Sequence, residues 1–166
     1  SNLQAGASSI ESSATIATYG DNSAGAWSQS GGWIDLTGGS ISTEGSTSNG
    51  INSVGSGSRV WIQDDFTSVQ TIGANSHGLS VSRTGAAGAG GTILANSVDI
   101  STTGSGSNGI DARTGGRLLH LDGSDPSLAL SDTVVLFDGT ITATGPASNA
   151  IYAETDSSLF IETGNG

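Results

Sequence analysis

A short motif recurs five times along the chain, and this repetition limits the possible folds more than any other feature of the sequence. Each copy is centred on a glycine, called the anchor here; the anchors are Gly20, Gly45, Gly73, Gly104 and Gly145. Ile or Val stands four residues before every anchor, and Ser stands three residues after it. Successive anchors are separated by 25, 28, 31 and 41 residues. A unit that is constant at its motif and variable in length after it is typical of a solenoid with loop insertions.

Each unit is expected to contain three short strands. Two of them flank the glycine turn, and the third is a short apolar run such as residues 33–36, 60–62, 117–121 or 159–161. Because side chains alternate between the two faces of a strand, Ile41 and Thr43 point to one side, as do Ile51 and Ser53. Each strand therefore sends one large and one small side chain inward, which suits a narrow core.

These features predict an all-β fold, a right-handed three-stranded parallel β-helix of about six coils. Coils stacked about 4.8 Å apart give a rod of roughly 30 Å, which looks like a fragment of a longer solenoid. In such a stack every strand pairs with the strands above and below it. The glycines are expected to supply the positive φ of tight corners, and the Ser and Asn beside them to bond the turn backbone. A two-sheet sandwich would explain the alternation but not the identical turns.

The whole chain, residues 1–166, is expected to form one β-helix segment. The repeat is interrupted near residues 84–97 and 122–133, which we interpret as insertion loops. Insertions in solenoids tend to emerge on one side and often carry recognition, although a tolerated surface loop is the simpler interpretation.

Composition narrows the possible partners. The chain has 15 acidic residues against 4 arginines and no lysine, so its net charge is −11. A phosphate backbone or an anionic lipid surface is repelled by such a charge, so we expect no nucleic-acid partner. No apolar run approaches the roughly 20 residues of a membrane span, and we expect no direct membrane insertion. Disorder is disfavoured despite the 27 glycines, because Ile and Val recur at regular intervals.

The recurring pattern I-x-T-x-G-x-x-S-N-G-I, present at residues 41–51 and 100–110, resembles the passenger region of pertactin-like bacterial autotransporters. The similarity covers essentially the whole chain. It implies export through the outer membrane and a β-helical stalk that is displayed at the bacterial cell surface or secreted. It further implies a role in adhesion, aggregation or host interaction. The translocator barrel of that family is not in this sequence, nor is an Arg-Gly-Asp tripeptide.

Enzymes also use parallel β-helices, so a set of catalytic groups in this sequence would point to an enzyme. Asp64 and Asp65, with His77 and Arg83, resemble the acids, histidine and arginine of pectin-degrading glycosidases. His77, however, occupies a repeat position that holds Ala or Asn in the other units, which makes it a turn residue. Adjacent Asp64 and Asp65 would point to opposite faces of a strand, whereas paired catalytic carboxylates share a cleft. We therefore expect no enzyme activity; the alternative is a carbohydrate-active β-helix, either a polysaccharide lyase or a hydrolase.

No cofactor is expected. Calcium deserves consideration because oxygen ligands are abundant in the second insertion and beyond it, at Asp122, Asp125, Asp132 and Asp138. Their spacing fits neither a helix-loop-helix calcium site nor the calcium-binding nonapeptide repeat. A solvated acidic loop is the better interpretation.

The candidates for partner binding are outward aromatic side chains and acids in the second insertion. Alternation places Trp27, Trp33 and Trp61 on the outside, and Tyr19 follows the same parity. Trp33 and Trp61 each precede the next apolar repeat residue by eight, so they are expected to stack on successive coils. The two acidic candidates are Asp125 and Asp132. The expected partner is a host or bacterial surface protein, a glycan, or another copy of the chain. The competing interpretation is that the aromatic residues pack beneath a loop or a neighbouring coil.

Overall fold

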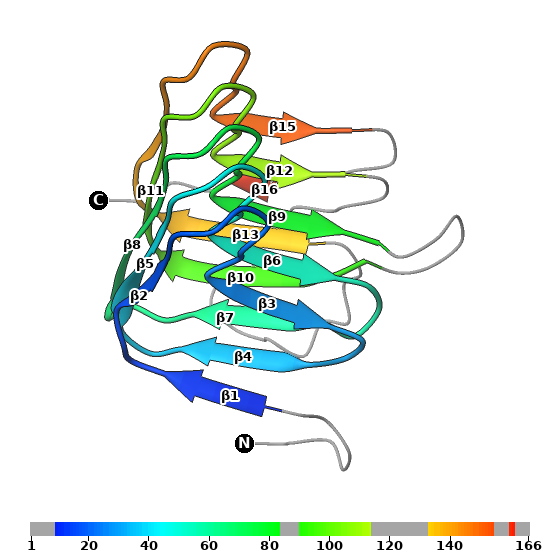
Figure 1. Ribbon diagram of the computed structural model, residues 1–166. Helices are drawn as coiled ribbons and strands as arrows, with labels where there is room; N and C mark the ends of the chain where they lie inside the picture. Colours follow the sequence, from blue (N-terminus) through cyan, green and yellow to red (C-terminus); the bar gives the residue numbers. More distant parts are fainter. Residues whose placement is uncertain (1–8, 84–89, 114–132, 155–159, 162–166) are drawn as a thin grey trace.

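The computed structural model describes residues 9–83, 90–113, 133–154 and 160–161, with side chains described throughout except in 133–138 and 160–161. Every element of these residues is a β-strand, as the sequence predicted. The strands form three parallel sheets around one core (Figure 1). No helix among the described residues has the length and hydropathy needed to cross a membrane.

Each coil contributes one strand to each sheet, in a fixed order. Sheet A contains β1 (Ser9–Ser12), β4 (Trp33–Leu36), β7 (Arg59–Ile62), β10 (Thr92–Ser97), β13 (Thr133–Asp138) and β16 (Phe160–Ile161). Sheet B contains β2 (Ile16–Thr18), β5 (Gly39–Thr43), β8 (Phe66–Thr71), β11 (Asp99–Thr102) and β14 (Ile141–Ala143). Sheet C contains β3 (Ala26–Gln29), β6 (Ile51–Val54), β9 (Leu79–Ser82), β12 (Ile110–Ala112) and β15 (Ile151–Ala153).

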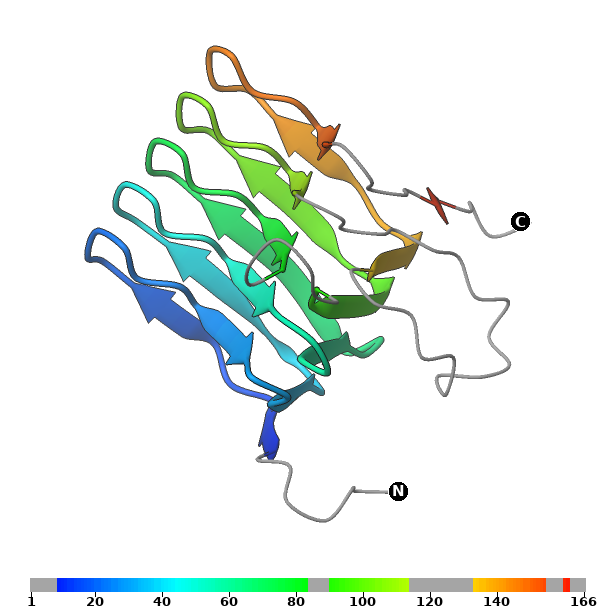
Figure 2. The same ribbon diagram turned by 90° about the vertical axis from the view of Figure 1, so that its right-hand side faces the viewer.

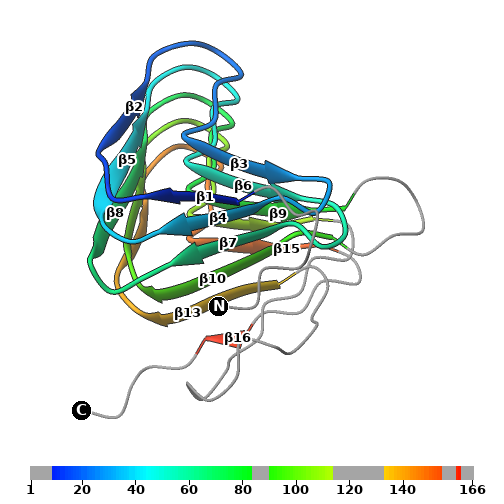
Figure 3. The ribbon, with the colours of Figure 1, turned by 90° about the horizontal axis from the view of Figure 1, so that it is seen from below.

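The chain winds as a right-handed solenoid. Seen from below in Figure 3, it runs clockwise from β1 through β2 and β3 to β4 while it recedes from the viewer. The described strands make sheets of six, five and five members, slightly fewer complete coils than the sequence led us to expect. The predicted fold class is confirmed.

Strand registers follow the repeat. In sheet B, the residues four positions before the anchors pair in one row: Ile16, Ile41, Val69, Ile100 and Ile141. In sheet C, the residues six positions after the anchors do the same: Ala26, Ile51, Leu79, Ile110 and Ile151. Residues at equivalent positions of the sequence repeat therefore lie next to each other in successive coils.

The core is a column of stacked side chains. Ile41, Val69, Ile51 and Leu79 are each at most 1% exposed, and the sheet A residues Val60, Ile62 and Ile93 are fully buried. The predicted small inward residues are also buried, namely Thr43, Thr71 and Thr102 in sheet B and Ser53 in sheet C. Burial of one large and one small side chain per strand holds neighbouring coils together mainly through the hydrophobic effect.

Two expectations about sheet A were wrong. The third coil enters this sheet with β10, so residues 92–97 are a strand and the insertion expected near 84–97 ends earlier. In the fourth coil, the strand that pairs with β10 is β13, not the expected run 117–121, which lies outside the described residues. Residues 117–121 and 133–138 are both short apolar runs, so hydrophobicity alone did not identify the strand that pairs with β10.

The role expected of the anchor glycines also needs correction. Within the repeated turn, positive φ falls two residues after the anchor, on Asn22, Thr47, Asn75, Gly106 and Ala147. Gly45 is the one anchor with a positive φ, of 124°. What Gly73 requires is space, because a Cβ there would run into the backbone carbonyl of Gly45 in the coil below. Close stacking of the turns, more than unusual dihedral angles, therefore explains the anchors.

Candidate functional site

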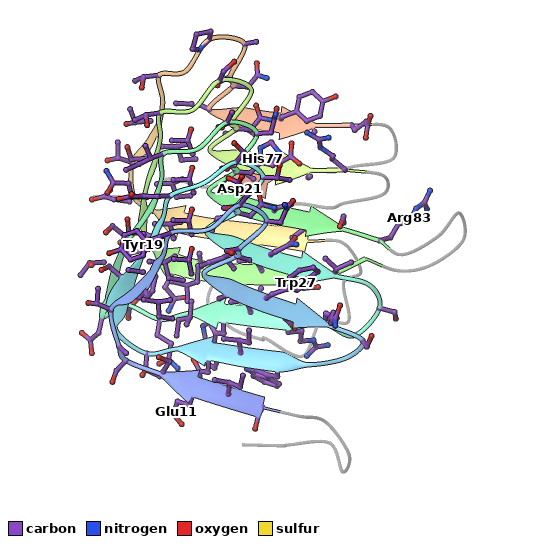
Figure 4. All side chains as sticks on the ribbon, in the orientation of Figure 1. Glu11, Tyr19, Asp21, Trp27, His77 and Arg83 are labelled. Carbon is purple, nitrogen blue, oxygen red and sulfur yellow. The ribbon has the colours of Figure 1, made fainter. Side chains whose placement is uncertain are left out.

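Two of the predicted aromatic residues lie open to solvent. Tyr19, directly after β2, is 75% exposed, and Trp27 in β3 is 54% exposed. Trp27 stands between buried Ala26 and Ser28, as alternation predicted. Figure 4 labels both side chains: Trp27 is on the outer face of sheet C and Tyr19 is on the sheet B side. They belong to different faces of the solenoid.

The other two tryptophans lie on sheet A and are only partly exposed. The register pairs Trp33 with Arg59, and Trp61 with Asp35, so the two indoles are offset along the sheet by two residues. The expectation that they stack on successive coils is therefore wrong. The cause is the corner between β7 and β8, which is longer than the preceding one, and a register shift between Gly39 and Ser40 absorbs part of the difference. The four aromatic candidates are thus spread over three sheets and form no single strip.

The acidic candidates Asp125 and Asp132 lie outside the described residues, as does Asp122. Asp138 ends β13, where only the backbone is described. The hypothesis of a binding or acidic surface in the second insertion is therefore untouched by the structure.

The most regular part of the molecule is the turn between sheets B and C, referred to below as the B–C turn. The five B–C turns lie above one another in a single row (Figure 2). A serine ladder joins them: the Ser76 hydroxyl donates to the Gly45 carbonyl oxygen at 2.9 Å and accepts from the Ser48 amide at 2.9 Å. Equivalent bonds join Ser48, Ser107 and Ser148 to the turns below them.

Threonines close four of the five turns from inside, and the fifth turn has Ala143 at the same position. The Thr71 hydroxyl donates to the Ser76 carbonyl oxygen at 2.6 Å, and Thr43 donates to the Ser48 carbonyl oxygen at 2.7 Å. Thr102 and Thr18 make the same bond in their own turns. These threonine side chains therefore point into the core, as predicted from their position two residues after the inward Ile or Val of the same strand.

A second ladder runs through the position four residues after the anchor, where His77 stands. The His77 amide donates to Asn49 Oδ1 at 2.9 Å, and the Asn108 amide donates to His77 Nδ1 at 3.0 Å. In the next turn the Asn149 amide donates to Asn108 Oδ1 at 3.0 Å. His77 therefore takes the place of an asparagine in the ladder, which confirms its interpretation as a turn residue.

His77 also belongs to a charged cluster at the edge of sheet C, the H–D–R cluster of His77, Asp111 and Arg113. Asp111 is 2% exposed. Its Oδ1 accepts from Asn108 Nδ2 at 2.8 Å, and its Oδ2 accepts from Arg113 Nε at 2.7 Å. His77 Nε2 lies 3.7 Å from Asp111 Oδ2 and 3.4 Å from Arg113 Nη2. The Arg113 guanidinium carbon is 5.7 Å from the centre of the Tyr152 ring.

The electrostatics of the cluster follow from burial and proximity. Burial lowers the pKa of His77, the Asp111 carboxylate acts in the opposite direction, and the Arg113 guanidinium lowers it further. The hydrogen bond to Asp111 raises the pKa of Arg113, which remains cationic. Both oxygens of Asp111 accept hydrogen bonds, one from Asn108 and one from Arg113. Its members therefore hold two coils together, and the half-exposed Arg113 is the part that faces solvent.

The glycosidase-like set is not assembled. Asp64 and Asp65 are exposed and lie at the corner between β7 and β8, whereas His77 lies in the turn between β8 and β9. These are different corners of the coil. The acid that the structure places near His77 is Asp111, which belongs to the next coil.

Sequence reasoning missed Asp111 and Arg113. The signal was present, because aligning the repeats sets Asp111 in a row with Trp27, Asn52, Ser80 and Tyr152, where it is the only charged member. The pair was missed because each unit was interpreted separately, whereas the side chains that contact each other on the outer face of a sheet come from adjacent coils.

A further hollow lies on the outer face of sheet B. Its polar lining comes from three adjacent strands and the residue before β14, through Ser68, Gln70, Asp99, Ser101, Thr140 and Thr142. This surface offers hydroxyls, one amide and one carboxylate, and it is shallow. Comparisons with protein families, curated proteins and solved structures gave no match.

Proposed function

We propose that this chain is a segment of a bacterial solenoid, displayed at the cell surface or secreted through the outer membrane, that acts by contact and not by catalysis. Its role is adhesion, aggregation or host interaction, or that of a stalk that carries such a surface. The partner class is a surface protein, a glycan or a second copy of the chain.

The observation that carries this proposal is the location of the length variation. The B–C turn has the same number of residues in all five coils, from 19–25 to 144–150. The stretches from sheet C to sheet A differ widely, from 30–32 after β3 to 113–132 after β12. The stretches from sheet A to sheet B differ by no more than two residues, so the large differences in length all fall at the corner between sheets C and A. Such a rod suits a scaffold that presents variable surface, because long insertions at one corner leave the three sheets in place.

The exposed aromatic side chains give a second, local support. Trp27 and Tyr19 each expose more than half of their surface, and tryptophan and tyrosine are enriched among residues that dominate binding energy. Their positions on sheets C and B would give the solenoid two contact faces, not one.

Export is tested by fusing the chain between a signal peptide and a translocator barrel in a Gram-negative host. We expect protease added to intact cells to remove the chain, and antibody to label it on the cell surface. Retention of a folded chain in the periplasm, with a known passenger exported in parallel, would contradict the proposed route.

Binding is tested with the purified, labelled chain on bacterial cells, on host cells and on a glycan array. We expect saturable attachment that Trp27→Ser or Tyr19→Ser weakens about tenfold, the loss typical of one aromatic anchor. Gln29→Ser, an exposed change on the same strand as Trp27, serves as the control. Attachment that neither aromatic variant alters would reject the two contact faces. Polysaccharide turnover that is lost on Asp65→Ala would favour the enzyme alternative.

A further inference from the structure

The ring of His77 joins two coils in a way that depends on its protonation. Nδ1 accepts the Asn108 amide at 3.0 Å, so this nitrogen carries a lone pair and the neutral ring holds its proton on Nε2. A second proton can only go to Nδ1. Two N–H donors would then face each other, and the Asn108 amide, in a residue that is 4% exposed, would lose its acceptor.

We infer that His77 is a proton-sensitive joint between the third and fourth coils. In the neutral state it continues the asparagine ladder from Asn49 to Asn108. A proton taken from solvent onto Nδ1 breaks that bond and loosens the turn. The inference rests on the ladder geometry and is independent of the proposed surface function.

The groups that face the ring set the direction of the effect. Asp111 and Arg113 come from the strand of the next coil and its end, with Oδ2 and Nη2 at 3.7 and 3.4 Å from Nε2. Tyr152 and Glu154, one coil further, act on Arg113. Among the described residues, the coil below bonds to His77 through the uncharged Asn49. The Asp111 carboxylate attracts a charged imidazole, but Arg113 repels it and burial disfavours it.

The sign of the linkage follows from the lowered pKa of His77. Above the unfolded value of about 6.5, the ring is neutral in both states and the joint contributes fully. Below that value the unfolded chain takes up the proton first, so the folded state loses stability as the pH falls toward the folded pKa. Between the two values, a single proton lowers the ratio of folded to unfolded chain by up to about tenfold per pH unit.

The decisive variant is His77→Asn, because asparagine is what the ladder already uses at positions 49, 108 and 149. Its amide oxygen can accept the Asn108 amide and does not titrate. Urea unfolding of the wild type and of this variant is followed between pH 7.5 and 5. We expect the wild type to lose stability relative to the variant below about pH 6.5. Subtracting the two curves removes the effect of the carboxylates common to both.

A local measurement keeps the inference testable if the variant folds poorly. Amide hydrogen exchange of the wild type gives the protection factor of Asn108 across the same pH range. The Asn149 amide is the internal control, since its acceptor is the Oδ1 of Asn108 and cannot be protonated in this range. We expect protection of Asn108 to fall on acidification, by up to about tenfold per pH unit, while that of Asn149 stays constant. The inference would be rejected if the protection factors of the Asn108 and Asn149 amides fell together on acidification, or if the wild type and His77→Asn lost the same stability at low pH.

Discussion

The B–C turn and the corner between sheets C and A belong to the same coils, yet the chain treats them in opposite ways. The turn keeps its length, its anchor Gly and its Ser through five coils, whereas the corner changes length in each coil that is described at both ends. In the turn, backbone and side chains bond to the coil above and the coil below. The corner has fewer bonds between coils, such as the one from the Gly31 amide to Ser58 Oγ. We infer that the denser hydrogen bonding between coils, and not curvature alone, fixes the sequence and length of the turn.

The strongest test of this comparison is to insert two residues, Gly-Ser, either into the B–C turn or into the corner between sheets C and A of the same coil. Placed between Ser46 and Thr47, they separate ladder partners on either side. We expect a loss of more than about 3 kcal/mol in the free energy of unfolding, because several buried hydrogen bonds worth about 1 kcal/mol each are displaced. Placed between Ser56 and Gly57, in the corner, they should cost less than about 1 kcal/mol, as loop-closure entropy rises slowly with length. Chemical denaturation measures both; equal losses would remove the distinction.

Gly73→Ala sharpens the comparison within the turn. The added Cβ meets the Gly45 carbonyl, and because this is backbone of the coil below, the turns must separate. We expect a loss of about 3 kcal/mol, at the upper end for overpacking. Gly20→Ala is the matched control, since its Cβ meets only the Ser23 hydroxyl oxygen at 3.1 Å in its own turn. A loss for Gly20→Ala as large as that for Gly73→Ala would mean that dihedral preference, not stacking, selects the anchors.

Ser76→Ala tests the ladder with a smaller change. It leaves the Ser48 amide without its acceptor and removes a donor from the Gly45 carbonyl. Unpaired buried polar groups of this kind cost about 2 kcal/mol in the free energy of unfolding. Ser56→Ala in the exposed corner should change stability by less than about 0.5 kcal/mol. Thermal denaturation of both variants and the wild type measures these changes. If Ser76→Ala left the stability unchanged, the serine ladder would not contribute to the stacking of the coils.

The exception in the repeat is explained by the same reasoning. Ala150 stands where the other units have glycine. A Cβ on Gly109, the equivalent residue one turn below, would meet Ala150 O at 2.6 Å and the Ile141 side chain. Ala150 lies in the last described turn, where the described residues place no further turn above it. Within the described residues, the Ala150 methyl therefore has no equivalent of the Ala150 O and Ile141 contacts that a Cβ on Gly109 would meet.

Much of the fold could be predicted from the sequence alone, because the repeat aligns residues that stack in space. The rows that contain Ile41 and Ile51, the inward threonines and the place of His77 in a turn all follow from spacing and alternation. In a solenoid each coil meets its neighbours at a fixed offset, so one-dimensional periodicity determines the three-dimensional register wherever the unit length is constant.

Tertiary structure decided what depends on contacts between coils of different length. It selected β10 and β13 as the sheet A strands, offset Trp33 from Trp61, and brought Asp111 and Arg113 to His77. These outcomes depend on how each corner absorbs its extra residues and on which side chains then face each other across adjacent coils. Such pairings are set by packing and burial in the assembled stack, and no single unit of the sequence contains them.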